Sequence, residues 1–460
     1  MWTPQLARLE GPRYLAIADA IADDVAAGRL TTGQRMPTHR ELADALGLTV
    51  GTITRAYAVA IERGLLSGEV GRGTFVRGTP PRARMTRLTP RDPDERVGVD
   101  LALNFLRVPE HDGVFARALA ELSRRPDLPA LFDEYKPQPG TREHRAAGAR
   151  WLARAGLTVA AEDVLVCAGA QHALTVALLT LTRPGDAIAV EAVTYPGMLA
   201  LARSLGRTVV GVAMDDEGML PQSLDAVCRT RHPRLVYCMP TVQNPTARVM
   251  STARREAIAQ VLQRHETAVL EDDVYGFLAA QCQLPIASLV PRLGHFIAAC
   301  TKSVAPGLRI GFLAVPRGEG GRFTEAAWAT AVMAPPLTAE LAARWIDDGT
   351  AARLADARRT EARARQQLAR AQLGCPQLLG DPAAFHLWLP LPPSISAAAF
   401  VAAAQHRGVQ VVPGEAFAAG HEAPAAVRVS LGPPHDHAEL QRGLAVVADV
   451  LRDDARWRGV

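Results

Sequence analysis

Apolar and polar positions alternate with the period of short helices over about the first 77 residues. Apolar residues recur every three or four positions over residues 12–27, 39–46 and 50–63, and a glycine follows each run, so three helices are predicted. The expected inward positions are Tyr14, Ile17, Ile21, Val25, Leu42, Leu46, Val50, Ile53, Tyr57 and Ile61. Residues 65–77 then predict a β-hairpin with Arg72 at a glycine-flanked tip.

Three helices followed by a hairpin make a winged helix-turn-helix. In this motif the third helix enters the major groove, so polar residues on its first turns and on its neighbours are candidate DNA contacts. These candidates are Arg40, Thr49, Thr52, Thr54, Arg55 and Arg72. A winged helix used only for protein contacts is the alternative.

Composition changes after this segment. Residues 78–99 hold four prolines among Arg and Asp without a hydrophobic period, which predicts a semi-stiff linker between a domain over residues 1–77 and one over 100–460. In the second domain seven short, mostly β-branched runs alternate with helical stretches: residues 164–166, 187–190, 209–212, 235–238, 268–270, 295–298 and 311–314. They predict an α/β domain with a mostly parallel seven-stranded sheet covered on both faces.

Bulk composition indicates a soluble globular chain. Hydrophobic residues make up 48% of it and the mean hydropathy is +0.03, yet no apolar run is long enough to span a bilayer. No basic-then-apolar signal segment opens the chain, and its six cysteines show neither C-x-x-C pairs nor zinc spacing, so a cytoplasmic protein is expected. The net charge of +4 is too small to indicate nucleic-acid binding by itself.

Lysine is nearly absent from the chain. Of 51 Lys and Arg residues, only Lys136 and Lys302 are lysines. Arg stays protonated at any working pH, whereas Lys can lose its proton in a suitable pocket and form a Schiff base. Lys302 is therefore the leading candidate for a nucleophile, and a surface lysine left by chance is the alternative. Lys136 directly follows Tyr135 and is expected at the surface, with a position near the site as the alternative.

Further candidates follow the ends of the predicted strands, where open α/β sheets bind ligands. Gly169, Ala170 and Gln171 lie at a predicted helix N-terminus, whose free N–H groups can hold a phosphate. Tyr195 offers an aromatic face for stacking. The remaining candidates are Asn244, Asp272, Tyr275, Lys302 and Arg309.

These residue types suit pyridoxal 5′-phosphate (PLP). Lys302 can form the imine, and Asp272 can hold the pyridinium nitrogen protonated. Asn244 and Tyr275 can donate hydrogen bonds to the phenolate oxygen, while Arg309 can bind the phosphate. A metal site at residues 271–273 is the competing use of the acids there, but consecutive acids on a strand alternate faces and chelate poorly.

Longer stretches then resemble known families. Residues 35–43, 50–57 and 71–76 closely resemble the N-terminal domain of GntR-family bacterial regulators. Residues from about 100 to 455 resemble a fold-type I aminotransferase domain, with a large lobe over about 155–315 and a small α+β lobe over about 320–460 that includes the N-terminal segment. The combined architecture is similar to that of MocR-type regulators.

The resemblance carries further implications. It implies a homodimer in which Tyr135 reaches the cofactor phosphate of the partner subunit, and it implies that Arg428 grips the α-carboxylate of a substrate or effector. A structural ion pair is the alternative for Arg428. One position departs from the family, which often has a hydroxyl residue three positions before the Schiff-base lysine. Here that position is Ala299, although Thr301 keeps a hydroxyl nearby.

Together these features predict a PLP-binding transcriptional regulator that recognises a double-stranded DNA operator. Our hypothesis is that an amino acid or amine displaces Lys302 from the cofactor, forms an external aldimine, and changes how two winged helices are spaced. A working aminotransferase with an accessory DNA-binding module is the main alternative. A regulator that binds its effector without PLP is disfavoured by the intact Lys302, Asp272 and Asn244.

Overall fold

The structure is a computed structural model of the 460-residue chain. It describes residues 2–4, 13–26, 29–31, 33–62, 65–69, 73–76, 98–108, 113–279, 283–374, 378, 380–420 and 423–452. The chain divides into two compact units, Met1–Thr89 and Pro90–Val460, and each is described by itself. Arg72 and nearly all of the expected linker lie outside the described residues.

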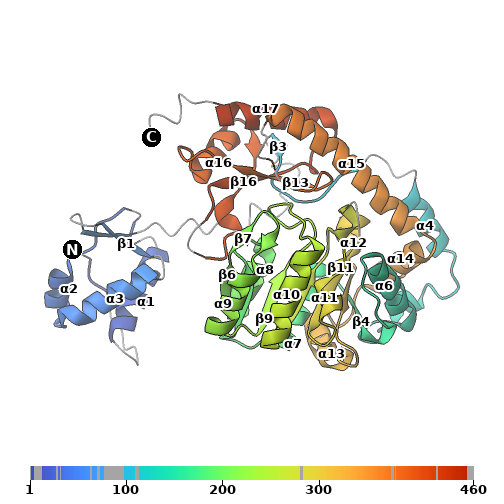
Figure 1. The fold of residues 1–460 in the computed structure, drawn as a ribbon, viewed down its shortest axis with the longest axis horizontal. Coiled ribbons are helices and arrows are strands. Elements are labelled where there is room, and N and C mark those ends of the chain that lie inside the picture. The colour runs from blue at the N-terminus through green and yellow to red at the C-terminus, as the bar shows by residue number, and fades with distance from the viewer. Residues whose placement is uncertain are drawn as a thin grey trace. The chain divides into compact units, whose positions relative to one another are not determined.

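The first unit contains the predicted three helices and hairpin (Figure 1). Its elements are α1 (Arg13–Ala26), α2 (His39–Leu46), α3 (Val50–Glu62), β1 (Leu66–Glu69) and β2 (Gly73–Val76). The two strands pair antiparallel, with Leu66 opposite Val76. Thr38 and Glu41 cap the start of α2 reciprocally, and Gly47 ends the helix at a φ of 62°, so the turn into α3 is fixed by local sequence.

The buried face of α3 differs from the predicted one. Ile53 and Tyr57 are buried as expected, but Val50 and Ile61 are 43% and 42% exposed. Ala56 and Ala60 take their place against α1. These four buried positions follow the i, i+3, i+4, i+7 stripe of a helix, and the small alanines allow close approach of α1, so Val50 and Ile61 fall outside the stripe.

The second unit is built on a seven-stranded sheet with the order β4-β12-β11-β10-β9-β5-β6. Its strands are β4 (Val164–Cys167), β5 (Ala187–Glu191), β6 (Thr208–Val212), β9 (Leu235–Cys238), β10 (Ala268–Asp272), β11 (Gly294–Ala299) and β12 (Gly311–Ala314). All seven predicted runs therefore form one sheet. It is mostly parallel, as predicted, and β12 is the strand that runs antiparallel to both of its neighbours.

Helices cover both faces of this sheet (Figure 1). On one face lie α7 (Ala170–Leu181), α8 (Pro196–Ser204) and α13 (Gly320–Ala331). On the other face lie α6 (Arg142–Arg154), α9 (Pro221–Arg231), α10 (Thr252–His265), α11 (Ile286–Leu289) and α14 (Pro336–Asp347). Because side chains alternate along a strand, Leu270 packs on the α7 face and Val269 on the α10 face.

A smaller sheet, with the order β13-β16-β15, forms the core of the C-terminal lobe. Its parts are β13 (His386–Pro390), β15 (Val412–Pro413), β16 (Ala426–Ser430), α16 (Ala397–His406) and α17 (His437–Arg452), and α15 (Thr350–Leu373) leads into it. The N-terminal strand β3 (Val99–Asp100) pairs with β14 (Val409–Gln410), which joins the start of the second unit to this lobe.

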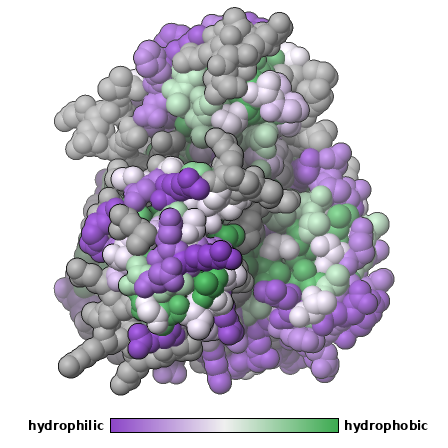
Figure 2. Space-filling view, turned by 90° about the vertical axis from the view of Figure 1, so that its left-hand side faces the viewer, coloured by the Kyte–Doolittle hydropathy of each residue, from purple (hydrophilic) through white to green (hydrophobic). Residues whose placement is uncertain are grey.

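The remaining elements are short. They are α4 (Val114–Leu122), α5 (Ala130–Asp133), β7 (Met214–Asp215), β8 (Gly218–Met219), α12 (Cys300–Ser303) and four 3₁₀ turns over residues 161–163, 276–278, 306–308 and 414–416. In the parts of the chain that the structure describes, no helix is both long and apolar enough to cross a membrane. Figure 2 shows one face of the molecule, where hydrophilic residues are interspersed with smaller apolar areas.

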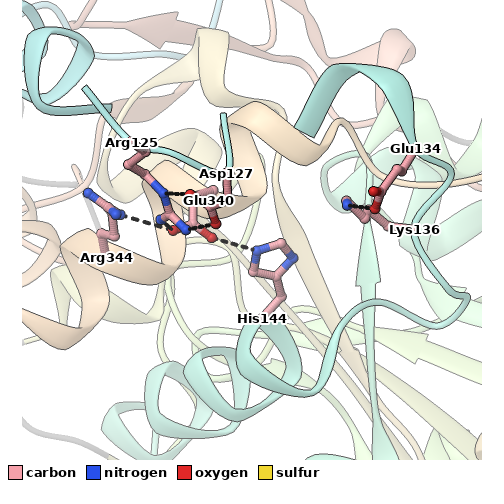
Figure 3. Close-up of polar contacts among 7 residues, drawn as sticks. All are labelled: Arg125, Asp127, Glu134, Lys136, His144, Glu340 and Arg344. Carbon is pink, nitrogen blue, oxygen red and sulfur yellow. Dashed lines mark hydrogen bonds and ion pairs between the residues drawn. The ribbon is translucent and has the colours of Figure 1, made fainter. Parts of the chain in front are cut away.

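An ionic cluster ties α14 to the segments before it (Figure 3). Glu340 contacts Arg125 and accepts hydrogen bonds from Arg344, at 2.9 Å, and from His144, at 3.2 Å. The hydrogen bond from His144, followed by those of the arginines, lowers the pKa of Glu340 from 4.5 to about 2 despite its burial. The cluster therefore favours the folded state only while Glu340 is ionised.

We expect Glu340→Gln to lower the free energy of unfolding at pH 7 by about 2 kcal/mol, because a carboxylate with a depressed pKa stabilises the fold when charged. In the wild type this contribution is complete above pH 4.5 and is lost as the pH falls toward 2. Urea unfolding at several pH values measures both effects. The control is Asp347→Asn, also on α14, which removes an exposed ion pair with Arg150 of α6 and should cost less than about 1 kcal/mol. Equal losses in the two variants would contradict the assignment.

Candidate cofactor site and DNA-binding unit

Lys302 lies on α12, the one-turn helix that directly follows β11. Its Nζ donates a hydrogen bond to the Asn104 carbonyl oxygen and lies 5.9 Å from the ring centroid of Tyr275. Burial, followed by the charges of Arg428 and Arg309, lowers the pKa of Lys302 to about 8, and Asp272 opposes this shift. Much more of this amine is therefore neutral near physiological pH than for an ordinary lysine.

Asp272 ends β10 and is 2% exposed. Its Oδ2 accepts a 2.8 Å hydrogen bond from the Tyr237 hydroxyl of the neighbouring strand β9. Burial raises the pKa of Asp272 to about 6, whereas the Tyr237 hydrogen bond and the Lys302 charge act in the opposite direction. The carboxylate thus remains mostly ionised at neutral pH and can hold a proton on a basic ring nitrogen.

Asn104 belongs to the site but was not a candidate from the sequence. Its Nδ2 donates to the Tyr275 hydroxyl at 2.8 Å and lies 3.0 Å from Nδ1 of His386. His386 Nε2 lies 3.1 Å from the Gln243 carbonyl, which can only accept, so Nδ1 is the acceptor for Asn104. Burial lowers the pKa of His386 to about 3, in agreement with this neutral ring. A polar residue between Leu103 and Phe105 was the one available signal in the sequence.

Arg428 projects from β16 and is 2% exposed. Its guanidinium donates to Asn244 Oδ1 at 2.9 Å and to the Ala102 carbonyl oxygen, and it lies 4.9 Å from the ring centroid of Phe417. It makes no ion pair within the described part of the chain. A buried cation paired only with neutral acceptors is available to an anionic ligand.

Gly169 and Arg309 form a second cationic position, at the start of α7. Gly169 adopts a φ of 86°, and a Cβ there would lie 2.7 Å from the Arg309 guanidinium. A Cβ at Gly311 would lie 3.0 Å from the backbone nitrogen of Ala170. Only glycine permits both close approaches, so a guanidinium meets the free N–H groups of a helix N-terminus.

Tyr195 is influenced by the charges of both cationic positions, Arg428 and Arg309. Its hydroxyl donates to Gln171 Oε1 at 3.1 Å, and a Cβ on Gly197 would lie 2.3 Å from its ring. Burial and then the Asp272 charge raise the pKa of Tyr195, while Arg428 and Arg309 lower it. The structure therefore gathers most of the candidate residues in one region: Gly169, Ala170, Gln171, Tyr195, Asn244, Asp272, Tyr275, Lys302, Arg309 and Arg428.

Tyr135 is the exception. It is 83% exposed. The neighbouring Lys136 forms a 2.9 Å ion pair with Glu134 (Figure 3). Of the two lysines in the chain, Lys136 thus has an acidic partner, whereas the charges of two arginines, Arg428 and Arg309, act on Lys302.

Unpartnered polar atoms test whether a polar cofactor suits this region. Asn104 Oδ1, Thr301 Oγ1 and Arg428 Nε are buried and have no hydrogen-bond partner among the described residues. Buried polar atoms are normally bonded, so three orphans on or beside the residues around Lys302 indicate that a polar ligand belongs there. With the two cationic positions, they fit a cofactor that carries both ring heteroatoms and an anionic group.

The three acids at the end of β10 have separate environments. Glu271 lies 3.3 Å from Arg255, Asp272 accepts from Tyr237, and Asp273 interacts with Thr241. Asp272 faces the α7 side of the sheet, and the other two face the α10 side. In the described ranges no group of three or more His, Cys, Asp or Glu residues is arranged to hold a metal ion.

In the first unit, the DNA-contact candidates lie on the surface of α2 and α3. Arg40, Thr49, Thr54 and Arg55 are exposed, and Thr52 is half-buried. The hydroxyl oxygens of Thr49 and Thr52 form a hydrogen bond of 2.9 Å. The Arg55 guanidinium lies 4.1 Å from the ring centroid of Tyr14 on α1, so it stacks within the unit. Thr49, Thr52 and Thr54 keep their positions on the first turns of α3.

The fold and the site together define a winged helix-turn-helix regulator joined to an aminotransferase-type domain. Residues 13–76 match the model of the gntR family of bacterial regulatory proteins, and residues 96–447 match that of aminotransferase class I and II. The chain therefore belongs to the GntR-type transcriptional regulators that carry a class I and II aminotransferase domain.

Two curated relatives match this chain over nearly its whole length. The uncharacterized HTH-type transcriptional regulator YdeF of Bacillus subtilis is 31% identical over 98% of this chain and 97% of its own length. The vitamin B6 salvage pathway transcriptional repressor PtsJ of Salmonella typhimurium is 28% identical over 93% of this chain and 96% of its own. Among solved structures, the α-aminoadipate aminotransferase LysN of Thermus thermophilus matches 80% of this chain and 96% of its own, with a TM-score of 0.70 and 24% identity.

Proposed function

We propose that the second unit binds PLP through Lys302 and senses an amino acid or amine there, and that the chain passes this signal to its DNA-binding unit. One observation carries the proposal: a lysine with a lowered pKa faces Asp272 and two arginines, in a chain that also holds a GntR-type DNA-binding unit. The aminotransferase class I and II family implies PLP.

Each part of the cofactor would have a partner in this region. When bound, PLP supplies an aldehyde that condenses with primary amines. Lys302 is the amine that would hold it, and Asp272 would keep a proton on the ring nitrogen. Arg309 and the N–H groups at the start of α7 would bind the phosphate. Because Asn244 Oδ1 is already bonded to Arg428, its Nδ2 and the Tyr275 hydroxyl are the groups that remain for the phenolate oxygen.

The effector is recognised by two groups. Its amine competes with Lys302, and its carboxylate, where it has one, binds the Arg428 guanidinium. Arg428 retains a buried Nε without a partner, so a carboxylate adds a charge-assisted hydrogen bond that simple amines lack. Amino acids should therefore bind more tightly than amines of similar size.

Exposed apolar residues support a homodimer. Leu119, Phe132, Tyr135 and Trp328 are each more than half exposed, and a dimer contact that covered them would remove apolar area from water. A dimer would place Tyr135 near the partner's phosphate site and would present two winged helices to paired DNA half-sites.

Aminotransferase activity is the second candidate function. The lowered pKa favours it, because Lys302 can accept and return a proton near neutral pH once it is free. Steady turnover of an amino acid with a keto acid, without any effect on DNA binding, would select this reading.

The test couples two measurements on the full-length protein. Amino acids and amines are screened for changes in cofactor absorbance, and each is then added to a fluorescence titration with DNA from upstream of the chain's own gene. We expect specific binding that weakens with salt, and an effector that changes DNA affinity by about 5- to 150-fold. Compounds that change the absorbance but leave DNA affinity constant would contradict the regulatory role.

A further inference from the structure

A second cavity lies on the opposite face of the sheet from the Lys302 amine. It has a volume of about 180 Å³ and is lined by residues of α6, the end of β10, β11, α12 and α15. The residues that matter most are Trp151, Thr241, Asp273, Phe277, Ala299 and Ser303. A cavity of about 150 Å³ already admits a benzene ring, so this one has room for a small organic molecule.

Asp273 is one of two carboxylates that line this cavity; the other, Asp356, is already paired with Arg359. Asp273 is 8% exposed and makes no ion pair with any residue in the described ranges. Arg255, whose charge acts on Asp273, is already bonded to Glu271 at 3.3 Å and to the Thr241 hydroxyl at 2.8 Å. Burial, followed by the Glu271 charge, raises the pKa of Asp273 well above its usual range. Asp273 thus has a hydrogen bond with the Thr241 hydroxyl but no ion-pair partner of its own among the described residues.

Two arginines, Arg154 and Arg359, also line the cavity, and each already contacts another of its lining residues. Arg359 donates to Asp356 at 2.7 Å, and the Arg154 guanidinium lies 5.6 Å from the ring centroid of Trp151. An anionic ligand would be repelled by Asp273, and the Glu271 charge, which already acts on Asp273, would add to this repulsion. A cation, in contrast, would pair with Asp273 and would find an aromatic side chain on Phe277, which attracts ammonium groups.

We propose that this cavity is a second ligand site, which takes a small primary amine whose ammonium group pairs with Asp273 and whose apolar part packs on Trp151 and Phe277. The site is separate from the one at Lys302, because Asp272 and Asp273 project to opposite faces of the sheet. Ala299 and Ser303 line the cavity and flank Lys302 on the same short turn. An occupant therefore contacts the segment that carries the reactive amine.

The experiment uses the full-length Lys302→Ala variant, freed of cofactor, so that amines cannot be captured at the first site. Isothermal titration measures the binding of benzylamine, benzyl alcohol and benzoate. We expect one benzylamine per chain, with benzyl alcohol and benzoate each at least about tenfold weaker. No saturable benzylamine binding, or tighter binding of benzoate, would overturn the proposal. Because no cofactor is present, neither result depends on the function of Lys302.

Two further variants locate the site. Ala155→Leu fills the cavity from the end of α6, whereas Ala153→Leu adds the same volume at an exposed position of that helix. We expect Ala155→Leu to weaken benzylamine binding at least about tenfold and Ala153→Leu to leave it unchanged. Asp273→Asn should weaken it to a similar degree, since the shape is kept and the charge is lost. Equal affinity in the Ala155→Leu and Ala153→Leu proteins would place the amine elsewhere.

Discussion

Replacement of Lys302 by Ala is expected to abolish covalent attachment of PLP and to leave the fold intact. The other lysine, Lys136, is held in an ion pair with Glu134, and no arginine can act as the nucleophile. Borohydride reduction followed by peptide mapping should label the peptide that contains residue 302 in the wild type and no peptide in the variant. Lys302→Arg is the matched control, because it keeps the charge but cannot condense. A label retained in either variant would refute the assignment.

The pH dependence of PLP uptake tests the same group. Only the neutral amine attacks an aldehyde, and burial together with Arg428 and Arg309 lowers the pKa of Lys302 to about 8. The rate of uptake by protein freed of cofactor should therefore rise with pH and reach half its maximum near pH 8. An ordinary lysine would give a midpoint above 10.

The second large effect concerns stability. We expect Arg255→Ala to lower the free energy of unfolding by about 3–5 kcal/mol, because it leaves Glu271 buried without a counter-charge. Both members of this pair are at most 1% exposed, and Arg255 also donates to the Pro240 carbonyl and the Thr241 hydroxyl. Denaturant unfolding monitored by circular dichroism measures the loss.

Two controls separate charge burial from simple truncation. Arg254→Ala removes the neighbouring arginine of α10, whose partner Asp215 is 41% exposed, and should cost about 1 kcal/mol or less. Arg255→Met combined with Glu271→Leu removes both charges and should recover much of the stability lost in Arg255→Ala. If the double replacement is as unstable as the single one, shape rather than charge determines the effect.

The large sheet was predictable from the sequence because its strands are buried on both faces. Such strands form continuous apolar runs, and each of the seven runs became one strand. The buried face of α3 was harder to predict. Alanine carries little hydrophobic signal, so Ala56 and Ala60 were overlooked in favour of the larger Val50 and Ile61.

The candidate site divides in the same way. Residues that directly follow strands, such as Asp272 and Lys302, could be named because strand ends converge. Asn104 and His386 could not be named in this way. They come from the N-terminal segment and from β13, and nothing in the sequence indicates that these distant segments meet at the site. Tyr237 was read as one more apolar strand residue, although its hydroxyl lies on the same face as Asp272.

The short pairing of β3 with β14 attaches the segment after the linker to the C-terminal lobe. Val99 lies opposite Val409, and five residues later the Asn104 carbonyl receives the Lys302 amine. The segment that follows the linker is thus paired with the C-terminal lobe at Val99 and hydrogen-bonded to Lys302 at Asn104. A group that occupied the Lys302 nitrogen would compete with its hydrogen bond to the Asn104 carbonyl, which lies in the segment that follows the linker.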